Sequence, residues 1–254
     1  MGLKEVLKKQ GGMNLLRQYW HGGAFFTAMG EFLLLGRDKK ALEILRLSAQ
    51  YKIKKNLEKK YQNEINEFQS TYTDDVLHDV SNKVWVCWFQ GLNNAPDIVK
   101  KCYKSLKENL TDREIIVITS DNMSDYVKFP KFILDKWKSG QITHTHMTDL
   151  LRLELLIKYG GMWIDATVLC TSNRKEIPDY FFNSDLFLYQ TLKPGRDGQS
   201  QPISSWLISA KTNNKILMMT RYLCYEYWKK NNKMVDYFLF HDFVMISLEH
   251  NEGD

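Results

Sequence analysis

Two acidic residues and one arginine near the middle of the chain have the types and spacing needed to bind an anionic ligand. Asp149 and Arg152 lie three residues apart in a segment whose apolar residues have helical spacing, so both side chains share one helix face. Asp165 follows inside the apolar run 163–168. A carboxylate at the end of a buried strand can bind a divalent cation, and the cation can bridge a diphosphate. Periodicity alone therefore predicts an anionic-ligand site without naming a reaction.

Each of these residues also has a purely structural interpretation. Asp149 with Arg152 fits an exposed ion pair between adjacent helix turns, which is the commoner outcome of that spacing. Asp165 fits a carboxylate satisfied by backbone groups or by an arginine, because an unpaired buried carboxylate is costly. The pair Gly160-Gly161 is explained as a helix stop. The spacing leaves both interpretations open.

The elements that must position these residues begin with two buried strands. Residues 84–89 and 114–119 are short apolar runs typical of buried parallel strands, and residues 95–109 between them have helical spacing. This βαβ pattern predicts a parallel sheet covered on both faces. Ligands of such sheets bind beyond the carboxyl ends of the strands, which draws attention to Gln90-Gly91 and to residues 120–122.

A second helix and strand carry the charged residues themselves. Residues 147–159 are predicted as a helix that ends at Gly160-Gly161, and residues 162–171 as the strand that follows. A period of two in that strand places Trp163, Asp165 and Thr167 on the same side. Further along, the pattern predicts a loop at 193–199, a strand at 206–210 and a helix at 213–228.

The N-terminal segment differs from the rest of the chain in charge and texture. Residues 1–70 hold 13 Lys and Arg against 7 Asp and Glu, a net charge of +6, whereas the remaining residues hold 22 against 23. Apolar stripes at 3–7 and 42–57 predict helices, and glycine pairs interrupt the earlier part. We therefore expect a helical appendage over residues 1–75 and the main domain over residues 76–254.

Composition narrows the class of protein. The 4 cysteines are far apart and form no CxxC pair, as expected for reduced thiols of a cytosolic protein. The first apolar stretch, residues 24–35, contains Glu31 and is too short to span a membrane, and no signal peptide is evident. We expect a cytoplasmic protein. Nucleic-acid binding is not expected, because the excess basic residues lie outside the aromatic-rich sheet region.

The charged segment also resembles a known family signature. Thr148-Asp-Leu-Leu-Arg152 and Tyr159-Gly-Gly-Met-Trp-Ile-Asp165 resemble the S/T-D-x-x-R … Y-G-G-x-[YW]-x-D signature of DXD-type glycosyltransferases, which include α-mannosyl- and α-galactosyltransferases and the clostridial glucosylating toxins. The similarity is closer to a bacterial branch, the capsular polysaccharide synthesis proteins, whose motif runs W-I-D-[AS]-T. Residues 85–91, 205–206 and 240–242 resemble the same branch, so the resemblance covers about residues 80–250.

The resemblance implies a fold and a chemistry. It implies an α/β fold of GT-A type, a Rossmann-like, mostly parallel sheet flanked by helices, with the GT-A catalytic domain at residues 76–254. It further implies a nucleotide-sugar donor, UDP-linked, and retention of anomeric configuration. Retaining transfer of this kind needs no strong protein nucleophile, so the protein contributes positioning and charge stabilisation.

Roles for individual residues follow from the same resemblance. Trp88 and Gln90 are implied to flank the nucleotide base. Asp149 is implied to bind sugar hydroxyls, Arg152 to lie near the sugar or phosphates, and Asp165 to be the first carboxylate of the DXD motif. The full set of catalytic residues is expected to be Asp165, Asp149 and Arg152, and the further donor contacts are expected to be Asn122, Tyr159 and Gly161.

The metal site departs from the family pattern. Thr167 stands where the motif has its second carboxylate, so a Mn²⁺ or Mg²⁺ ion is expected to bind through Asp165, Thr167 and water, and its affinity stays open. His241 is a candidate to supply a further ligand from the C-terminal segment. The alternative for His241 is a packed or capping histidine.

The expected partners are a nucleotide-sugar donor and a saccharide acceptor of surface polysaccharide synthesis, lipid-linked and held at a membrane. Residues 1–70, with Trp20, Phe25, Phe26 and Phe32, are expected either to contact an anionic leaflet or to pack onto the catalytic domain. Relatives are expected to continue beyond the end of this chain, with part of the acceptor side there.

Two other classes of protein share some of these features. An Asp-nucleophile phosphatase needs a second Asp two residues after the first, and Asp165-Ala-Thr lacks it. A non-catalytic glycosyltransferase-fold subunit or scaffold remains the alternative. Thr167, in place of the second carboxylate of the motif, is the residue that favours it.

Overall fold

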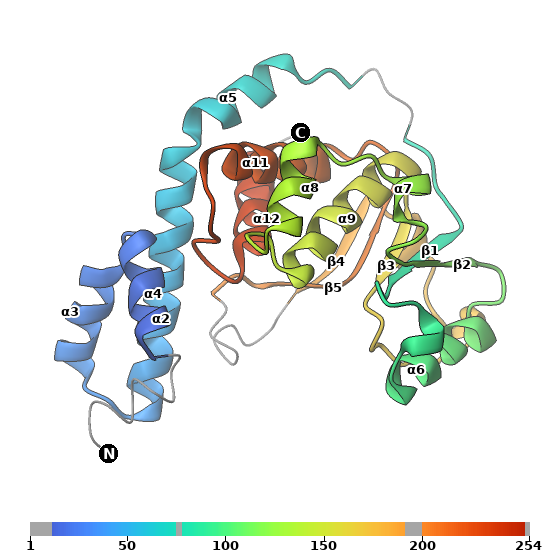
Figure 1. Ribbon diagram of the computed structural model, residues 1–254, viewed down its shortest axis with the longest axis horizontal. Coiled ribbons are helices and arrows are strands. Elements are labelled where there is room, and N and C mark those ends of the chain that lie inside the picture. The colour runs from blue at the N-terminus through green and yellow to red at the C-terminus, as the bar shows by residue number, and fades with distance from the viewer. Residues whose placement is uncertain (1–11, 75–77, 191–199, 252–254) are drawn as a thin grey trace.

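A mixed five-stranded sheet forms the centre of the molecule, as shown by a computed structural model that describes residues 12–74, 78–190 and 200–251 (Figure 1). The strand order is β2-β1-β3-β5-β4. β1 pairs in parallel with β2 and β3, whereas β5 is antiparallel to both of its neighbours, so β5 alone in this sheet runs against the other strands. The strands are β1 (Lys83–Cys87), β2 (Glu114–Ile118), β3 (Gly161–Ile164), β4 (Leu186–Gln190) and β5 (Ile203–Ala210). The predicted α/β fold with a mostly parallel sheet is confirmed.

Strand β1, which lies between β2 and β3, is buried on both faces, as its continuous apolar run predicts. Trp85 and Cys87 belong to the core on one face of the sheet, and Val84 and Val86 belong to the core on the other. The alternation follows from the period of two along a strand. β1, α6 (Asp97–Asn109) and β2 form the predicted βαβ unit.

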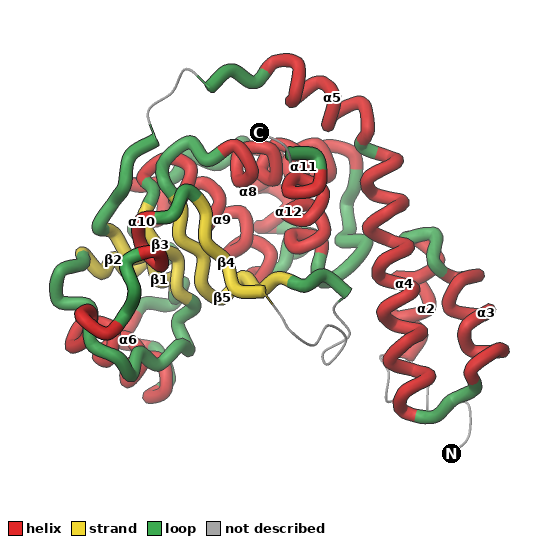
Figure 2. Tube along the Cα trace, turned by 180° about the vertical axis from the view of Figure 1, so that it is seen from behind, coloured by secondary structure: helices red, strands yellow, loops and turns green. Residues whose placement is uncertain are grey.

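Helices cover both faces of the sheet (Figures 1 and 2). α9 (His144–Tyr159) contacts β1, β3 and β5, and α11 (Lys215–Lys230) packs beside it. α8 (Lys131–Lys138) and α12 (Leu239–Glu249) pack against α11. α6 and α10 contribute Leu106 and Phe182 to the core on the opposite face. The remaining helices of this region are η1 (Leu92–Asn94), α7 (Met123–Tyr126), η2 (Arg174–Glu176) and α10 (Tyr180–Asn183).

The N-terminal region is helical, as expected, over its described part. It consists of α2 (Gly12–His21), α3 (Phe25–Leu35), α4 (Lys39–Lys60) and α5 (Gln62–Thr71). α2, α3 and the start of α4 extend away from the sheet (Figure 1). The end of α4 is nevertheless part of the main core, because Ile53 and Leu57 share one cluster with α11 and α12, and the buried Lys54 pairs with Glu249. The expected boundary between residues 75 and 76 and the apolar stripe at 3–7 lie outside the described residues.

No helix in the described part of the chain is both long enough and apolar enough to cross a bilayer. Large apolar side chains are nevertheless exposed on the N-terminal helices. Phe26, Leu33 and Leu34 of α3 are 70%, 75% and 83% exposed. Exposed apolar side chains of this size on one helix are typical of surfaces that contact a partner.

Among the boundaries that differ from the sequence expectation, two position the charged residues. The strand expected over 162–171 ends at Ile164, because the Val168 N–H turns back to donate to the Asp165 carbonyl at 3.0 Å. Asp165 therefore lies just beyond the strand, where its own N–H still donates to the Trp206 carbonyl of β5. α9 begins at His144, earlier than expected, because the Thr143 hydroxyl caps it by accepting from the His146 N–H. The loop expected at 193–199 lies outside the described residues.

The glycine pair between α9 and β3 is required by its backbone. Gly160 and Gly161 have φ of 63° and 91°, a region that other residues rarely adopt. A Cβ at Gly161 would lie 2.3 Å from the Lys83 carbonyl oxygen of β1. The pair thus stops the helix, as predicted, and lets β3 approach β1.

Candidate functional site

A cleft of about 430 Å³ opens at the carboxyl ends of β1 and β3. Parallel sheets bind ligands at this edge. Residues after β1, residues after β3, the first turns of α9 and the start of α12 all contribute to it. Among the residues expected at the site, the cleft is lined by Trp88, Gln90, Asp149, Arg152, Asp165, Thr167 and His241.

Arg152 joins the two carboxylates of the cleft. Its Nη1 donates to Asp149 Oδ1 at 2.9 Å, and its Nη2 donates to Asp165 Oδ1 at 3.1 Å. The guanidinium also lies over the rings of Trp163 and Phe240, at 4.9 and 5.3 Å from their centroids. Both members of the helical pair are buried, so the interpretation of Asp149 with Arg152 as an exposed surface pair is excluded.

A second buried contact orients Asp149. The indole N–H of Trp228 donates to His146 Nε2 at 2.9 Å. Because an indole nitrogen only donates, Nε2 must be the acceptor and the proton of His146 lies on Nδ1. That proton is donated to Asp149 Oδ2, 3.3 Å away. The Asp149 carboxylate is therefore held at both oxygens, by Arg152 on one and by His146 on the other.

The titratable groups of the cleft differ in the direction in which the structure shifts their pKa. Burial raises the pKa of Asp149, but Arg152 and the His146 hydrogen bond outweigh burial and hold this pKa below its ordinary value. Burial also raises the pKa of Asp165, and here Arg152 and Trp163 only partly oppose it, so the pKa lies above its ordinary value. Burial lowers the pKa of His241 to about 4, so its imidazole is neutral near pH 7.

Several side chains of the cleft hold buried nitrogen atoms without a hydrogen-bond partner in the described part of the chain. They are Trp88 Nε1, Arg152 Nε and His241 Nδ1. Elsewhere in the described residues only Arg113 Nε and Ser209 Oγ are in this condition. Buried polar groups are normally paired, because each unpaired one costs free energy. Their concentration at one cleft indicates a site that binds a polar ligand.

Three residues expected to contact the donor do not line the cleft. The Asn122 amide donates to the Val117 carbonyl at 2.9 Å and accepts from the Thr119 N–H at 2.8 Å, so it closes the turn after β2. The Tyr159 hydroxyl donates to a backbone carbonyl at 3.0 Å. Gly161 lies against β1. In this structure, each of the three has a local structural role.

The sequence interpretation missed His146, Trp228 and Tyr237. His146 precedes Asp149 by three residues, and that helical spacing could have identified it. Nothing in the sequence marks Trp228 or Tyr237, because both come from distant segments that reach the site only through the packing of α11 and α12.

Few of the described side chains in the cleft are suited to coordinate a metal ion. Asp165 Oδ1 already accepts from Arg152 and from the Trp163 indole, at 3.1 and 2.8 Å. Within the described ranges, no group of three His, Cys, Asp or Glu side chains is placed to hold a metal ion. Asp165 and Thr167 would supply at most part of an oxygen shell, so these residues do not by themselves form a complete metal site.

Comparison with known proteins places the chain in a family. The model of the family described as capsular polysaccharide synthesis protein matches residues 37–254, so the chain belongs to that family. It is 24% identical over 148 residues to the O-glycosyltransferase PaGT of Phomopsis amygdali, covering 52% of this chain and 36% of that protein. It is 33% identical over 94 residues to the O-glycosyltransferase braB of Annulohypoxylon truncatum, covering 33% of this chain and 22% of that protein.

The matched segments thus span about a third or less of the length of these curated relatives. Among solved structures, the chain is similar to the PaToxG glycosyltransferase, at 15% identity and a TM-score of 0.49 over 80% of each chain. The family resemblance inferred from residues 148–165 is confirmed by the family match.

Proposed function

We propose that this protein is a glycosyltransferase that moves a sugar from a UDP-linked donor to a saccharide acceptor in the synthesis of a capsular or surface polysaccharide. Membership of the capsular polysaccharide synthesis protein family and similarity to segments of glycosyltransferases support the reaction class. The observation that carries the proposal is the buried bridge from Arg152 to Asp149 and Asp165, in a cleft where buried nitrogen atoms have no hydrogen-bond partner among the described residues.

In this proposal the donor lies along the cleft from β1 to α9. Trp88 and Gln90 flank the base, and the unpartnered indole N–H of Trp88 donates to the nucleotide. Asp149 accepts hydrogen bonds from sugar hydroxyls, which its lowered pKa favours because it keeps the carboxylate ionised. Arg152 holds both carboxylates in place and supplies positive charge near the diphosphate.

The reaction we propose proceeds with retention. The bond from the anomeric carbon to the diphosphate oxygen breaks, UDP departs, and the acceptor oxygen bonds to the same face of that carbon. The acceptor proton passes to the departing phosphate oxygen, so no protein nucleophile is consumed. Asp149 and Asp165 both remain paired with Arg152, and the protein acts through positioning and charge.

A divalent cation bound with the diphosphate would neutralise part of the leaving group's charge. Since Asp165 and Thr167 form only part of an oxygen shell, we propose that the nucleotide completes the shell and that the cation binds weakly without it.

The proposal is tested by incubating the protein with a panel of UDP-sugars and saccharide acceptors, with and without manganese. The anomeric coupling constant of the product, measured by NMR, reports retention or inversion. Thermal shift runs in parallel, since a donor at a hundred times its Kd adds roughly 2.7 kcal/mol of stability. A donor that binds but is never transferred would identify the non-catalytic scaffold instead, and failure of every nucleotide sugar to bind would overturn the proposal.

We further propose that the acceptor is lipid-linked and that the protein contacts the cytoplasmic face of a membrane through residues 1–70, with α3 supplying apolar side chains. Trp20 and Phe26 are 62% and 70% exposed, and residues 1–70 carry a net charge of +6. Apolar side chains and basic residues together bind anionic leaflets. Replacing Leu33 and Leu34 by Ser should abolish co-sedimentation with anionic liposomes at low salt.

The matched control for this test is Ile98→Ser, since Ile98 is 56% exposed on α6. It should leave liposome binding unchanged. Binding by the Leu33/Leu34 variant equal to that of the unaltered protein would mean that α3 does not contact the membrane.

A further inference from the structure

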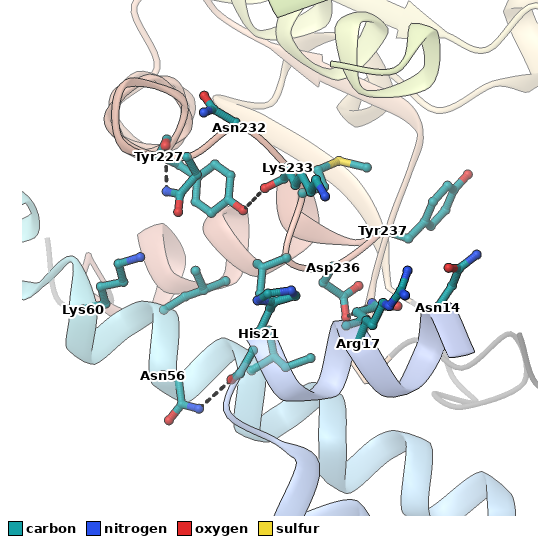
Figure 3. Close-up of a pocket in the computed structure, with 17 residues that line it drawn as sticks. Asn14, Arg17, His21, Asn56, Lys60, Tyr227, Asn232, Lys233, Asp236 and Tyr237 are labelled. Atoms are coloured by element: carbon teal, nitrogen blue, oxygen red, sulfur yellow. Dashed lines mark hydrogen bonds between the residues drawn. The ribbon is translucent and has the colours of Figure 1, made fainter. Parts of the chain in front are cut away.

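A second and larger hollow, of about 670 Å³, lies between α2, α4 and residues 231–237, which link α11 to α12 (Figure 3). Its wall is held by long-range contacts. Asp236 accepts from Gln18 of α2 at 2.9 Å and from Gln50 of α4 at 3.1 Å. Its volume is within the range of small-molecule sites. We call it the α2–α4 pocket.

The pocket is lined by basic side chains from three segments. They are Arg17, His21, Lys60 and Lys233. None of the four makes an ion pair with a carboxylate among the described residues, whereas basic side chains on neighbouring surfaces do, as in Lys55 with Glu58 and Lys230 with Glu64. Asp236 is the only carboxylate among the residues that line the pocket, and its oxygens already accept from Gln18 and Gln50. The cationic groups of Arg17, Lys60 and Lys233 outnumber it, so an anionic ligand would be attracted to this pocket.

The remaining lining is suited to a sugar. Asn14 and Asn56 present amides, which can donate to and accept from hydroxyl groups. Asn232 adds a third amide, whose Oδ1 accepts from Lys136 and whose Nδ2 can donate. Asn56 uses its Nδ2 to donate to the Gly22 carbonyl at 2.7 Å, which leaves its Oδ1 able to accept. Tyr237 adds a ring that is 62% exposed and able to pack against a sugar face.

The pocket adjoins the cleft at the carboxyl ends of β1 and β3. Tyr237 lines both hollows. Four residues further along the chain, His241 of α12 lines the cleft with its unpartnered Nδ1. A molecule seated in the α2–α4 pocket could therefore extend past Tyr237 toward a sugar bound beside Asp149 and Arg152.

We propose that the α2–α4 pocket binds the acceptor and that the acceptor is a saccharide carrying an anionic group, a phosphate or a carboxylate. The basic residues bind the anion, the amides bind hydroxyls, and Tyr237 directs the chain into the cleft. This inference rests on the proposed glycosyltransferase function.

The test uses the full chain labelled with ¹³C-methyl methionine and ¹⁵N-tryptophan. Met234 lines the α2–α4 pocket and Trp88 lines the cleft, so each hollow has its own NMR reporter. Glucose 6-phosphate, glucuronate, glucose and pyrophosphate are titrated separately, and UDP is titrated as a probe of the cleft.

We expect at least one of the two anionic sugars, glucose 6-phosphate or glucuronate, to shift the Met234 methyl signal and to bind about tenfold more tightly than glucose or pyrophosphate. The tighter of the two identifies phosphate or carboxylate as the anionic group. Lys60→Ala and Arg17→Ala should each weaken this binding about tenfold. Lys59→Ala, which removes an exposed neighbouring charge outside the pocket, should leave it unchanged.

The acceptor assignment would be overturned if the two anionic sugars shift only the Trp88 signal. It would also be overturned if Lys59→Ala weakens their binding as much as Lys60→Ala does. Pyrophosphate binding as tightly as the anionic sugars would reduce the pocket to a simple anion site and overturn it too. Failure of UDP to shift Trp88 would count against the proposed donor cleft, which keeps the two failures distinguishable.

Discussion

Replacing Arg152 by Met removes the charge that holds the candidate site together while keeping a side chain of similar length. Arg152 pairs with Asp149 at 2.9 Å and with Asp165 at 3.1 Å. In the variant both carboxylates lose their counter-charge, and the methionine still packs near Trp163 and Phe240. We expect a folded protein of clearly lower stability.

The two ion pairs contribute unequally to that loss. The side chains of Arg152 and Asp149 are 4% and 11% exposed, so breaking this pair leaves a buried charge uncompensated. Asp165 is 39% exposed, so water screens its pair and its contribution is small. Breaking one buried pair costs about 3 kcal/mol, at the low end of the usual range. For a chain of this length, that loss lowers Tm by about 6–12 °C.

The pH dependence of the loss provides a second check. In the unaltered protein the pKa of Asp149 is lowered, so this ion pair contributes stability that is present at neutral pH and lost only as pH falls through the folded-state pKa. Without Arg152, burial raises the pKa of Asp149, and the penalty at neutral pH disappears as the carboxyl takes up its proton. The difference between the two proteins should therefore shrink between about pH 7 and pH 4.5.

Urea denaturation at both pH values measures the loss. The matched control is Arg221→Met, which breaks the partly exposed ion pair between Arg221 of α11 and Glu154 of α9. That pair should contribute about 1 kcal/mol or less. Equal losses for the two variants, or a loss at Arg152 that does not change with pH, would refute the reasoning.

Four further predictions concern the site and its support. Asp165→Ala should lower transfer by a factor of about 100 or more with an unchanged circular dichroism spectrum, and transfer at the rate of the unaltered protein would mean that Asp165 is not at the reaction centre. Because burial raises the pKa of Asp165, the acidic limb of the pH–rate profile should lie above that of an ordinary aspartate, and kinetics across pH will show whether it does. Calorimetric titration should show manganese binding measurably only with UDP present; tight binding without nucleotide would reveal ligands beyond Asp165 and Thr167. Gly161→Ala should lower the free energy of unfolding, measured by urea denaturation, by about 3 kcal/mol or more. The new Cβ would lie 2.3 Å from the Lys83 carbonyl oxygen, and the alanine would also have to adopt a positive φ. Gly140→Ala has positive φ but open space, so it should cost only about 1–2 kcal/mol, and equal losses would contradict the close-approach argument.

Much of the site's framework could be predicted from the sequence, because it depends on short-range periodicity. Helical spacing placed Asp149 and Arg152 on one face, and the period of a strand placed Asp165 beside Trp163, whose indole donates to it at 2.8 Å. Apolar runs identified β1 and β2, and the residues that follow β1 line the cleft.

Local periodicity could not show which polar side chains already form hydrogen bonds within the protein. Asn122 follows a strand end, as a ligand residue would, yet its amide is bound to the backbone of its own turn. The strand expected to continue to residue 171 ends at Ile164, because a turn closes on the Asp165 carbonyl. Both outcomes depend on hydrogen bonds that compete with the regular pattern.

By itself, then, the sequence determined which carboxylates and which arginine could meet, since spacing along one helix and one strand fixes the direction of each side chain. Only the tertiary structure decided that Arg152 is buried between them, that Trp228 sets the tautomer of His146, and that Tyr237 joins two hollows. These features depend on α11, α12 and the segment between them packing against α9 and α4, and such long-range packing leaves no periodic trace in the chain.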